Sequence, residues 1–493
     1  MISYRMTAGL ETRVVEEPLY VDGAWRAASG EAIGVLDPAT ETPLADVASA
    51  TAPEVHAALE AARRAQPGWG ALSPITRGAL LREIADVLAA HRETLADLLV
   101  SEVGKPASQA AGELEFAESL LRYNAEWDRR LEGEILPGDG PGEVIHLLRA
   151  PVGVVGAICP WNFPLAVLCR KLAPALLTGN TIVIKPSEVT PLSTLEFVRL
   201  IDAHAQLPRG VVNLVTGGPS TGAALVADEL TTMISFTGHR DTGKAIMAAG
   251  AANLTRVALE LGGKAPAIVW RDADLDVAVP AIVAARHANS GQVCTCAERV
   301  LVHHDLLEPF TERYVTAVEA LRVGDPREAV DMGPLVSAAQ LAKTTAAIAG
   351  ARAEGATVVS GGGRPVGEAF ARGYWQEPTV LRDVSATMAV MHEETFGPVT
   401  PIIGVDSLAQ AVEIANDSRY GLSAYIFSRD YKAVMNTVDA LRFGEIYINR
   451  TLGESVHAHH SGYGESGIGG EDGKWGLYRY TQIKTAYHHY GDR

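Results

Sequence analysis

From about residue 151 the chain alternates short β-branched runs with longer helical patterns, and this alternation restricts the fold more than any other feature of the sequence. The first strand-like segments are 152–158, 181–184, 211–215, 233–236 and 257–261. A helical pattern over 192–205 lies among them and ends before Pro208. Short apolar strands that alternate with helices predict a parallel sheet covered on both faces. Such sheets bind ligands at the carboxyl ends of their strands.

A second set of the same kind follows, which predicts an α/β fold with two parallel-rich sheets. Its strand-like segments are 267–270, 299–303, 357–360, 399–405 and 425–427, with helical patterns near 275–288 and 408–415. Residues 132–150 predict an extended hairpin with Gly and Pro at its tip. Residues 478–490, rich in Tyr, Thr and His, suit a strand. We expect these two segments to be arms that reach a neighbouring subunit; the alternative is that they fold back on their own domain.

Charge and cysteine content exclude several classes of function. The formal net charge of −17 over 493 residues argues against nucleic-acid binding, which needs basic surfaces, and against an anionic membrane surface. We find neither an apolar run of signal-peptide length nor one that could span a membrane. Four cysteines in so long a chain do not form a disulfide framework, so we expect a cytoplasmic protein. The histidines at 457–460 lack partners at ligand spacing, and no metal site is expected.

Three polar residues stand where packing alone does not explain them. Cys294 follows a helical pattern at a Gly-Gln turn. A lone cysteine is usually a small apolar residue, but a nucleophilic thiolate needs such a polar, accessible approach. Glu260 lies between two leucines and before two glycines. It is either a general base or a partly exposed glutamate on a turn. Asn162 lies between Pro160 and Pro164; it is either an oxyanion donor or a turn-stabilising residue.

Six motifs, in this order along the chain, resemble the aldehyde dehydrogenase superfamily. They are PWNFP (160–164), TGNTIVIKPSE (178–188), ISFTG (234–238), LELGGK (259–264), GQVC (291–294) and EETFGPV (393–399). The resemblance runs from about residue 19 to the C-terminus, and the 34-residue spacing from Glu260 to Cys294 also matches the family. It implies two α/β domains with parallel-rich sheets plus a β-arm for oligomerisation, in a homodimer or homotetramer. The implied division is a dinucleotide-binding domain at 1–128 and 152–262, a catalytic domain at 263–474, and arms at 129–151 and 475–493.

The resemblance also implies a role for each of the three polar residues. Cys294 attacks the aldehyde carbon, while Asn162 and the backbone N–H of Cys294 hold the oxyanion. Hydride then passes to the nicotinamide, and water activated by Glu260 hydrolyses the resulting thioester. A glutamate at this position favours hydrolysis over transfer to coenzyme A. Lys171 resembles the lysine of the family's proton-relay region, but Lys474 departs from the glutamate that many relatives carry near there, which puts a lysine–glutamate relay in doubt.

The expected cofactor is NAD, with NADP possible. The chain lacks the GxGxxG fingerprint. Gly238–Gly243 resembles the turn that contacts the cofactor pyrophosphate in the family, and a helix is expected to begin near it. His239 stands where the family usually has Ser, whose hydroxyl contacts the phosphate. Either His239 or Arg240 supplies a replacement for this contact, or both side chains are solvated. A carboxylate at Glu188 would repel a 2′-phosphate, which favours NAD. The resemblance assigns to the cofactor Ile158, Pro160, Trp161, Lys185, Ser187, Glu188, Gly238, His239, Gly243, Leu261, Glu394 and Phe396.

The C-terminal part resembles most the lactaldehyde and glycolaldehyde dehydrogenase branch of the family. The matching substrate residues are Arg170, Glu454 and His460, a set that suits a small polar or hydroxylated aldehyde such as lactaldehyde or glycolaldehyde. Residues 451–453 and 463–465 differ from that branch, so an anionic semialdehyde or a pathway-specific aldehyde stays an alternative. Arg170 has the alternative role of a salt bridge within its helix. A non-catalytic binding relative is the alternative of another class, but it would have no reason to keep Cys294, Glu260 and Asn162 together.

Overall fold

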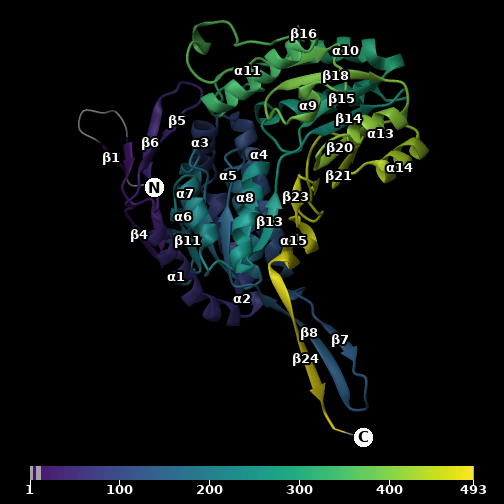
Figure 1. The fold of residues 1–493 in the computed structure, drawn as a ribbon. Helices are drawn as coiled ribbons and strands as arrows, with labels where there is room; N and C mark the ends of the chain where they lie inside the picture. The colour runs from purple at the N-terminus through teal and green to yellow at the C-terminus, as the bar shows by residue number, and fades with distance from the viewer. Residues whose placement is uncertain (1–3, 7–12, 492–493) are drawn as a thin grey trace.

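The computed structural model describes residues 4–6 and 13–491, which form two α/β units and a projecting arm (Figure 1). An eight-stranded sheet and its helices make the first unit, and a seven-stranded sheet and its helices make the second. The arm extends away from both units and ends at the C-terminus (Figure 1). Two smaller sheets complete the fold. They contain β1 (Tyr4–Met6), β2 (Arg13–Val15), β5 (Ala32–Leu36) and β6 (Pro43–Ala48), and β19 (Tyr420–Gly421) with β22 (Tyr463–Gly464).

The first sheet has the parallel centre that the sequence predicts. Its order is β23-β13-β12-β9-β10-β11-β3-β4. The parallel strands are β9 (Val154–Ile158), β10 (Thr181–Lys185), β11 (Val212–Leu214), β12 (Met233–Thr237) and β13 (Arg256–Glu260). Antiparallel strands complete both edges: β3 (Leu19–Val21), β4 (Ala24–Arg26) and β23 (Gly467–Ile468). All residues of β9 and β10 are buried, as expected of strands with helices on both faces.

The helix α5 (Pro164–Leu177) is the most buried element near the ends of these strands, since all of its residues are buried. Pro164 lies in its first turn, where the missing N–H costs no hydrogen bond. The helix therefore begins at the last residue of the PWNFP motif and carries Arg170 and Lys171 into the interior. The other helices of this unit are α1 (Ala52–Ala71), α2 (Pro74–Ala90), α3 (Arg92–Val103), α4 (Ala107–Ala125), α6 (Leu192–His204), α7 (Pro219–Ala227), α8 (Arg240–Gly250) and α15 (Gly473–Arg479).

The second sheet has the order β16-β17-β18-β15-β14-β20-β21 and is parallel except for β16. Its strands are β14 (Ala265–Val269), β15 (Ala297–His303), β16 (Thr357–Ser360), β17 (Thr379–Arg382), β18 (Val399–Val405), β20 (Ser423–Phe427) and β21 (Glu445–Ile448). Its helices are α9 (Leu275–His287), α10 (His304–Glu319), α11 (Ala338–Ala353), α12 (Ala389–His392), α13 (Leu408–Asn416) and α14 (Tyr431–Ala440). Only four residues separate β13 from β14, so Glu260 lies at the junction of the two units.

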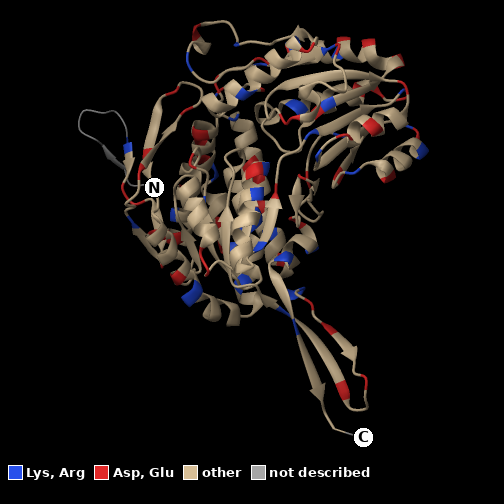
Figure 2. Cartoon of the chain, viewed as in Figure 1, with Lys and Arg blue, Asp and Glu red and all other residues tan. Residues whose placement is uncertain are grey.

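The arm is an antiparallel sheet built from the two segments expected to be extended. It consists of β7 (Glu134–Pro137), β8 (Glu143–Pro151) and β24 (Thr481–His489). Its surface is apolar in places: Ile135, Ile483 and Tyr487 are 74%, 58% and 79% exposed. Figure 2 shows few charges on the arm, whereas acidic and basic residues are mixed over the two units. Among the described residues, we find no helix that is long and apolar enough to cross a membrane.

Candidate active site

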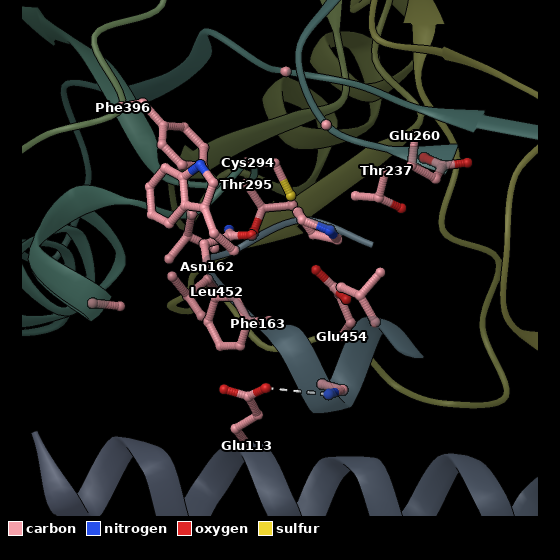
Figure 3. Close-up of a pocket in the computed structure, with 18 of the residues that line it drawn as sticks. Glu113, Asn162, Phe163, Thr237, Glu260, Cys294, Thr295, Phe396, Leu452 and Glu454 are labelled. Carbon is pink, nitrogen blue, oxygen red and sulfur yellow. Dashed lines mark hydrogen bonds between the residues drawn. The ribbon is translucent and has the colours of Figure 1, made fainter. Parts of the chain in front are cut away.

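A cavity of about 500 Å³ collects the polar residues that the sequence singles out. Asn162 comes from the loop after β9, Glu260 from the end of β13, and Cys294 from the loop that precedes β15. Glu454 and His460 reach the same cavity from the segment after β21. Figure 3 shows the sulfur of Cys294 between Asn162 on one side and Glu260 on the other. Residues more than a hundred positions apart therefore meet in one place, as predicted.

Cys294 is presented by a turn with unusual backbone geometry. Asn289, Ser290 and Gly291 have φ values of 46°, 57° and 76°, in the left-handed region. A Cβ at Gly291 would lie 2.6 Å from the backbone of Gly397, so a larger residue does not fit there. The turn leaves Cys294 partly accessible, whereas Cys296 is fully buried. Cys294 is thus the cysteine that a substrate in this cavity can reach.

Asn162 is held with one N–H available to the cavity. Its Nδ2 donates to the carbonyl of Gln292 at 2.9 Å, and a primary amide carries two such donors. Its own carbonyl accepts from Lys105 Nζ at 2.8 Å and from Asn289 Nδ2 at 3.2 Å. Lys105 is paired with Glu113, which also accepts backbone N–H groups from the first turn of α5. The sequence analysis missed Lys105 and Glu113; a charged pair within an apolar helical segment was the available signal.

Glu260 is a buried carboxyl group with open lone pairs. It is 2% exposed, and neither of its oxygens has a hydrogen-bond partner among the described residues. His460 Nε2 lies 3.7 Å from Glu260 Oε2. Burial raises the pKa of Glu260 to about 8, although the charge of His460 opposes the rise. A carboxyl group that titrates near neutral pH beside a nucleophile suits a general base.

Lys171 does have a glutamate partner, although Lys474 stands where many relatives carry a glutamate; a proton relay through this pair stays a prediction. Lys171 Nζ donates to Glu471 Oε1 at 2.6 Å and to Thr237 Oγ1 at 2.8 Å. Glu471 faces inward because its backbone forms a two-way bridge with His460, at 3.0 and 2.7 Å. The sequence placed the partner near 474, because local spacing in a glycine-rich loop does not indicate which acidic residue turns inward.

Arg170 forms salt bridges between elements rather than within its helix. Its Nη2 pairs with Glu454 and lies 2.8 Å from Asp472 Oδ2, and its Nε donates to Asp472 Oδ1 at 3.1 Å. Burial would raise the pKa of Glu454, but the charges of His460 and Arg170 outweigh it and lower that pKa to about 2. Both charges are therefore present in the cavity wall at neutral pH, and the guanidinium is already neutralised by carboxylates.

His460 stands at the centre of an acidic group. Its Nδ1 bonds Glu445 Oε1 at 3.1 Å and lies 3.8 Å from Glu454 Oε1. Glu445 was missed by the sequence analysis, because one acidic residue at the start of a strand carries no distinctive pattern. Ligand-type atoms of Glu445, Glu454 and His460 lie within 4.8 Å of one another. Arg170 forms a salt bridge with Glu454, and Tyr447 donates a hydrogen bond to Glu445. We therefore assign no metal here, and the expected absence of a metal stays a prediction.

The other end of the cavity is lined by residues predicted to contact the cofactor. Glu394 Oε1 accepts from Gly263 N at 2.8 Å, and a Cβ at Gly262 would meet the Glu394 carboxylate at 2.5 Å. Trp161 and Phe396 form an edge-to-face pair with centroids 5.4 Å apart. The predicted cofactor residues that line the cavity are Pro160, Trp161, Gly238, His239, Leu261, Glu394 and Phe396. Gln340 and Lys343 of α11 also line it and were missed.

The remaining predicted cofactor residues lie outside the lining of this cavity: Ile158, Lys185, Ser187, Glu188 and Gly243. Lys185 Nζ is 3.5 Å from Glu188 Oε2. His239 caps α8 by accepting from Asp241 N at 3.2 Å. Arg240 pairs with Asp241 and Glu465. Neither residue is merely solvated, and the contact of either with a phosphate stays a prediction.

Comparison with known proteins gives consistent matches over nearly the whole chain. Residues 25–486 match the model of the aldehyde dehydrogenase family. Lactaldehyde dehydrogenase of Escherichia coli (strain K12) is 46% identical over 477 residues, which cover 96% of this chain and 98% of the relative. The crystal structure of lactaldehyde dehydrogenase from Escherichia coli has a TM-score of 0.94 at 45% identity, covering 97% and 99% of the two chains. A structure of 3,6-anhydro-L-galactose dehydrogenase in complex with NAP has a TM-score of 0.93 at 43% identity, covering 95% and 99%.

Proposed function

Because this chain belongs to the aldehyde dehydrogenase family, we propose that it oxidises a small, neutral, hydroxylated aldehyde to the carboxylic acid. The resemblance and the fold class predicted from the motifs are confirmed. The chain is an NAD(P)-dependent aldehyde dehydrogenase. Its substrate and the roles of its individual residues are the proposed part. The observation that carries the substrate proposal is the pairing of Arg170, in the cavity wall, with Glu454 and Asp472.

The residues present fit a nicotinamide dinucleotide. Gly262 leaves room for Glu394 to approach the chain between the units, and Gly238 and His239 lie in the same cavity at the N-terminus of α8. A helix N-terminus offers free N–H groups to phosphate. Glu394 and Phe396 would hold the nicotinamide end. When bound, the cofactor accepts the hydride that leaves the substrate carbon.

The chain's own residues would perform the remaining steps. Cys294 forms the carbon–sulfur bond, and the free N–H of Asn162 donates to the oxyanion that results. Loss of hydride from that carbon leaves a thioester. Glu260 takes a proton from water, which attacks the thioester and releases the acid and the Cys294 thiolate. The Lys171–Glu471 pair lies beside this base and supports its proton exchange.

The salt bridges of Arg170 favour a neutral substrate over an anionic semialdehyde. The guanidinium is paired through its Nε and Nη2 atoms with two acidic side chains, Glu454 and Asp472. A substrate carboxylate would add a third negative charge to this group and would meet the ionised Glu454 at close range. A hydroxyl group can instead donate to the free lone pairs of Glu454 without any rearrangement. The geometry therefore supports lactaldehyde, glycolaldehyde or a related hydroxyaldehyde.

A substrate panel tests this proposal. We would compare kcat/KM for lactaldehyde, glycolaldehyde, propanal and succinic semialdehyde by NAD(P)H absorbance, with and without coenzyme A. The hydroxyaldehydes are expected to exceed propanal by about tenfold or more, the value of one hydrogen bond to a charged group. Glu454→Gln should reduce that preference, because it removes the charged acceptor. A higher kcat/KM for the semialdehyde than for either hydroxyaldehyde would reject the assignment.

We further propose NAD as the preferred cofactor, because the Glu188 carboxylate beside Lys185 would repel a 2′-phosphate. The apolar, exposed side chains of the arm support a homodimer or homotetramer in which the arm contacts another subunit. The division into a dinucleotide-binding domain (1–128 and 152–262), a catalytic domain (263–474) and arms (129–151 and 475–493) remains a proposal. So does a cytoplasmic location, which the four free cysteines support.

A further inference from the structure

Glu445 is a partly buried acidic residue that none of the motifs and none of the proposed steps uses. It is the first residue of β21, an edge strand of the second sheet. Its side chain is 13% exposed, and it accepts from Tyr447 Oη at 3.0 Å. Its other oxygen bonds His460 Nδ1 at 3.1 Å. The residue thus reaches from the second unit to the imidazole at the wall of the active site.

The bond from Glu445 determines which way the imidazole faces. Because Nδ1 is occupied by Glu445, the opposite nitrogen, Nε2, faces Glu260 at 3.7 Å, in the cavity that Cys294 also lines. The backbone of His460 is fixed independently by its two hydrogen bonds with Glu471. A carboxylate therefore holds one nitrogen of an imidazole whose other nitrogen shares a cavity with a thiol. The same order orients the imidazole in thiol and hydroxyl nucleophile triads.

The groups around His460 set its charge. Glu445 faces it from β21, Glu454 from the following loop and Glu260 from β13. Arg170 of α5, which lines the same cavity, is paired with Glu454 and Asp472. Burial would lower the pKa of His460, but the charges of Glu454 and Glu445 outweigh it and hold the pKa well above its usual value. Burial raises the pKa of Cys294, and the hydrogen bond and charge of His460 oppose that rise.

We propose that Glu445 and His460 form a charge couple that stabilises the Cys294 thiolate, with Glu445 as the positioning residue and His460 as the group that contacts the sulfur. In this step the S–H bond of Cys294 breaks and its proton passes to solvent water. His460 keeps its own two protons, so its positive charge stays beside the sulfur when the carbon–sulfur bond forms and again when the thiolate is released. The inference rests on the proposed role of Cys294 as the nucleophile.

The pH dependence of alkylation measures thiolate formation without substrate or cofactor. The enzyme would be treated with iodoacetamide between pH 5 and 10, and labelling at Cys294 followed by mass spectrometry. His460→Gln keeps a polar side chain but removes the charge. We expect it to move the inflection of the labelling rate upward by about one pH unit, which lowers the rate near neutral pH about tenfold. The rate at the high-pH plateau should not change.

Variants of Glu445 test the positioning role. Glu445→Gln should shift the inflection in the same direction as His460→Gln, whereas Glu445→Asp, which keeps the charge at shorter reach, should restore part of the wild-type profile. Melting temperatures identify any variant that does not fold, and Glu445→Asp then serves alone. His459→Gln is the matched control, because this neighbouring histidine bonds the carbonyl of Glu471 rather than Cys294. Its profile should equal that of the wild type.

Two failures are distinguishable. If iodoacetamide does not label Cys294 in the wild type, the proposed function itself is wrong. A second outcome is that Cys294 is labelled but the pH profile of labelling does not change in His460→Gln or in folded Glu445→Gln. If KM for the aldehyde rises in that variant, His460 is a substrate contact only. In that case the charge couple is rejected and the proposed function stands.

Discussion

The pH dependence of thioester hydrolysis is the sharpest consequence of the burial of Glu260. Burial raises the pKa of this carboxyl group to about 8, against the opposing charge of His460. Only the ionised form can take a proton from water, so the hydrolytic step must accelerate as pH rises through that value. A solvent-exposed glutamate would be fully ionised at neutral pH and would give no such dependence.

The size of the effect follows from the position of this pKa. With a pKa of about 8, roughly a tenth of Glu260 is ionised at pH 7 and roughly nine tenths at pH 9. The rate of hydrolysis should therefore rise about tenfold over these two pH units. An ordinary glutamate pKa of about 4.3 would leave the rate almost constant over the same interval.

Stopped-flow detection of NAD(P)H separates the two halves of the reaction. At saturating aldehyde and cofactor, the burst reports formation of the thioester and the subsequent linear phase reports hydrolysis when hydrolysis limits turnover. Glu260→Gln should keep the burst and slow the linear phase by about 10²–10⁴-fold, the usual contribution of a general base. A linear phase that stays constant between pH 7 and 9 in the wild type, with a normal burst, would refute the reasoning.

The remaining predictions concern three other sites. Asn162→Ala should slow the burst by about 10²–10³-fold, as expected for loss of an oxyanion donor; an unchanged burst would exclude this role. Arg170→Met should destabilise the fold by about 3–5 kcal/mol in chemical denaturation, because it leaves the largely covered carboxylates of Glu454 and Asp472 without their counterion, and an unchanged midpoint would contradict the pairing. Ile483→Glu, at an exposed apolar position of the arm, should reduce the mass measured by light scattering if the arm holds subunits together.

Much of the fold and the centre of the site could be predicted because they depend on local patterns. Strand and helix periodicity predicted most of the parallel strands: residues 181–184 were expected as a strand and 192–205 as a helix, and the structure has β10 at Thr181–Lys185 and α6 at Leu192–His204. Strands β17 and β21 were not predicted. Cys294, Glu260 and Asn162 each stand in a short motif at the end of a strand or helix. Such ends gather at one edge of a parallel sheet, and the resemblance of these motifs to the family predicted that the three side chains meet.

The partners of Lys171, Arg170 and His460 could not be predicted in the same way. Each contact joins residues far apart in sequence: 300 positions for Lys171 and Glu471, and 302 for Arg170 and Asp472. Which of several acidic residues turns inward is decided by how the loop after β21 packs between the two units, and local spacing carries no information about that packing. Glu445 shows the same limit, because its role depends on the imidazole opposite it.

The sequence by itself therefore determined the class of fold and identified the proposed nucleophile, base and oxyanion amide, because periodicity and short motifs are encoded within a few neighbouring residues. The tertiary structure decided the ionisation of Glu260, the pairing of Arg170 and the orientation of His460. These properties arise from desolvation and from charges brought together across two units, and both exist only once the chain is packed.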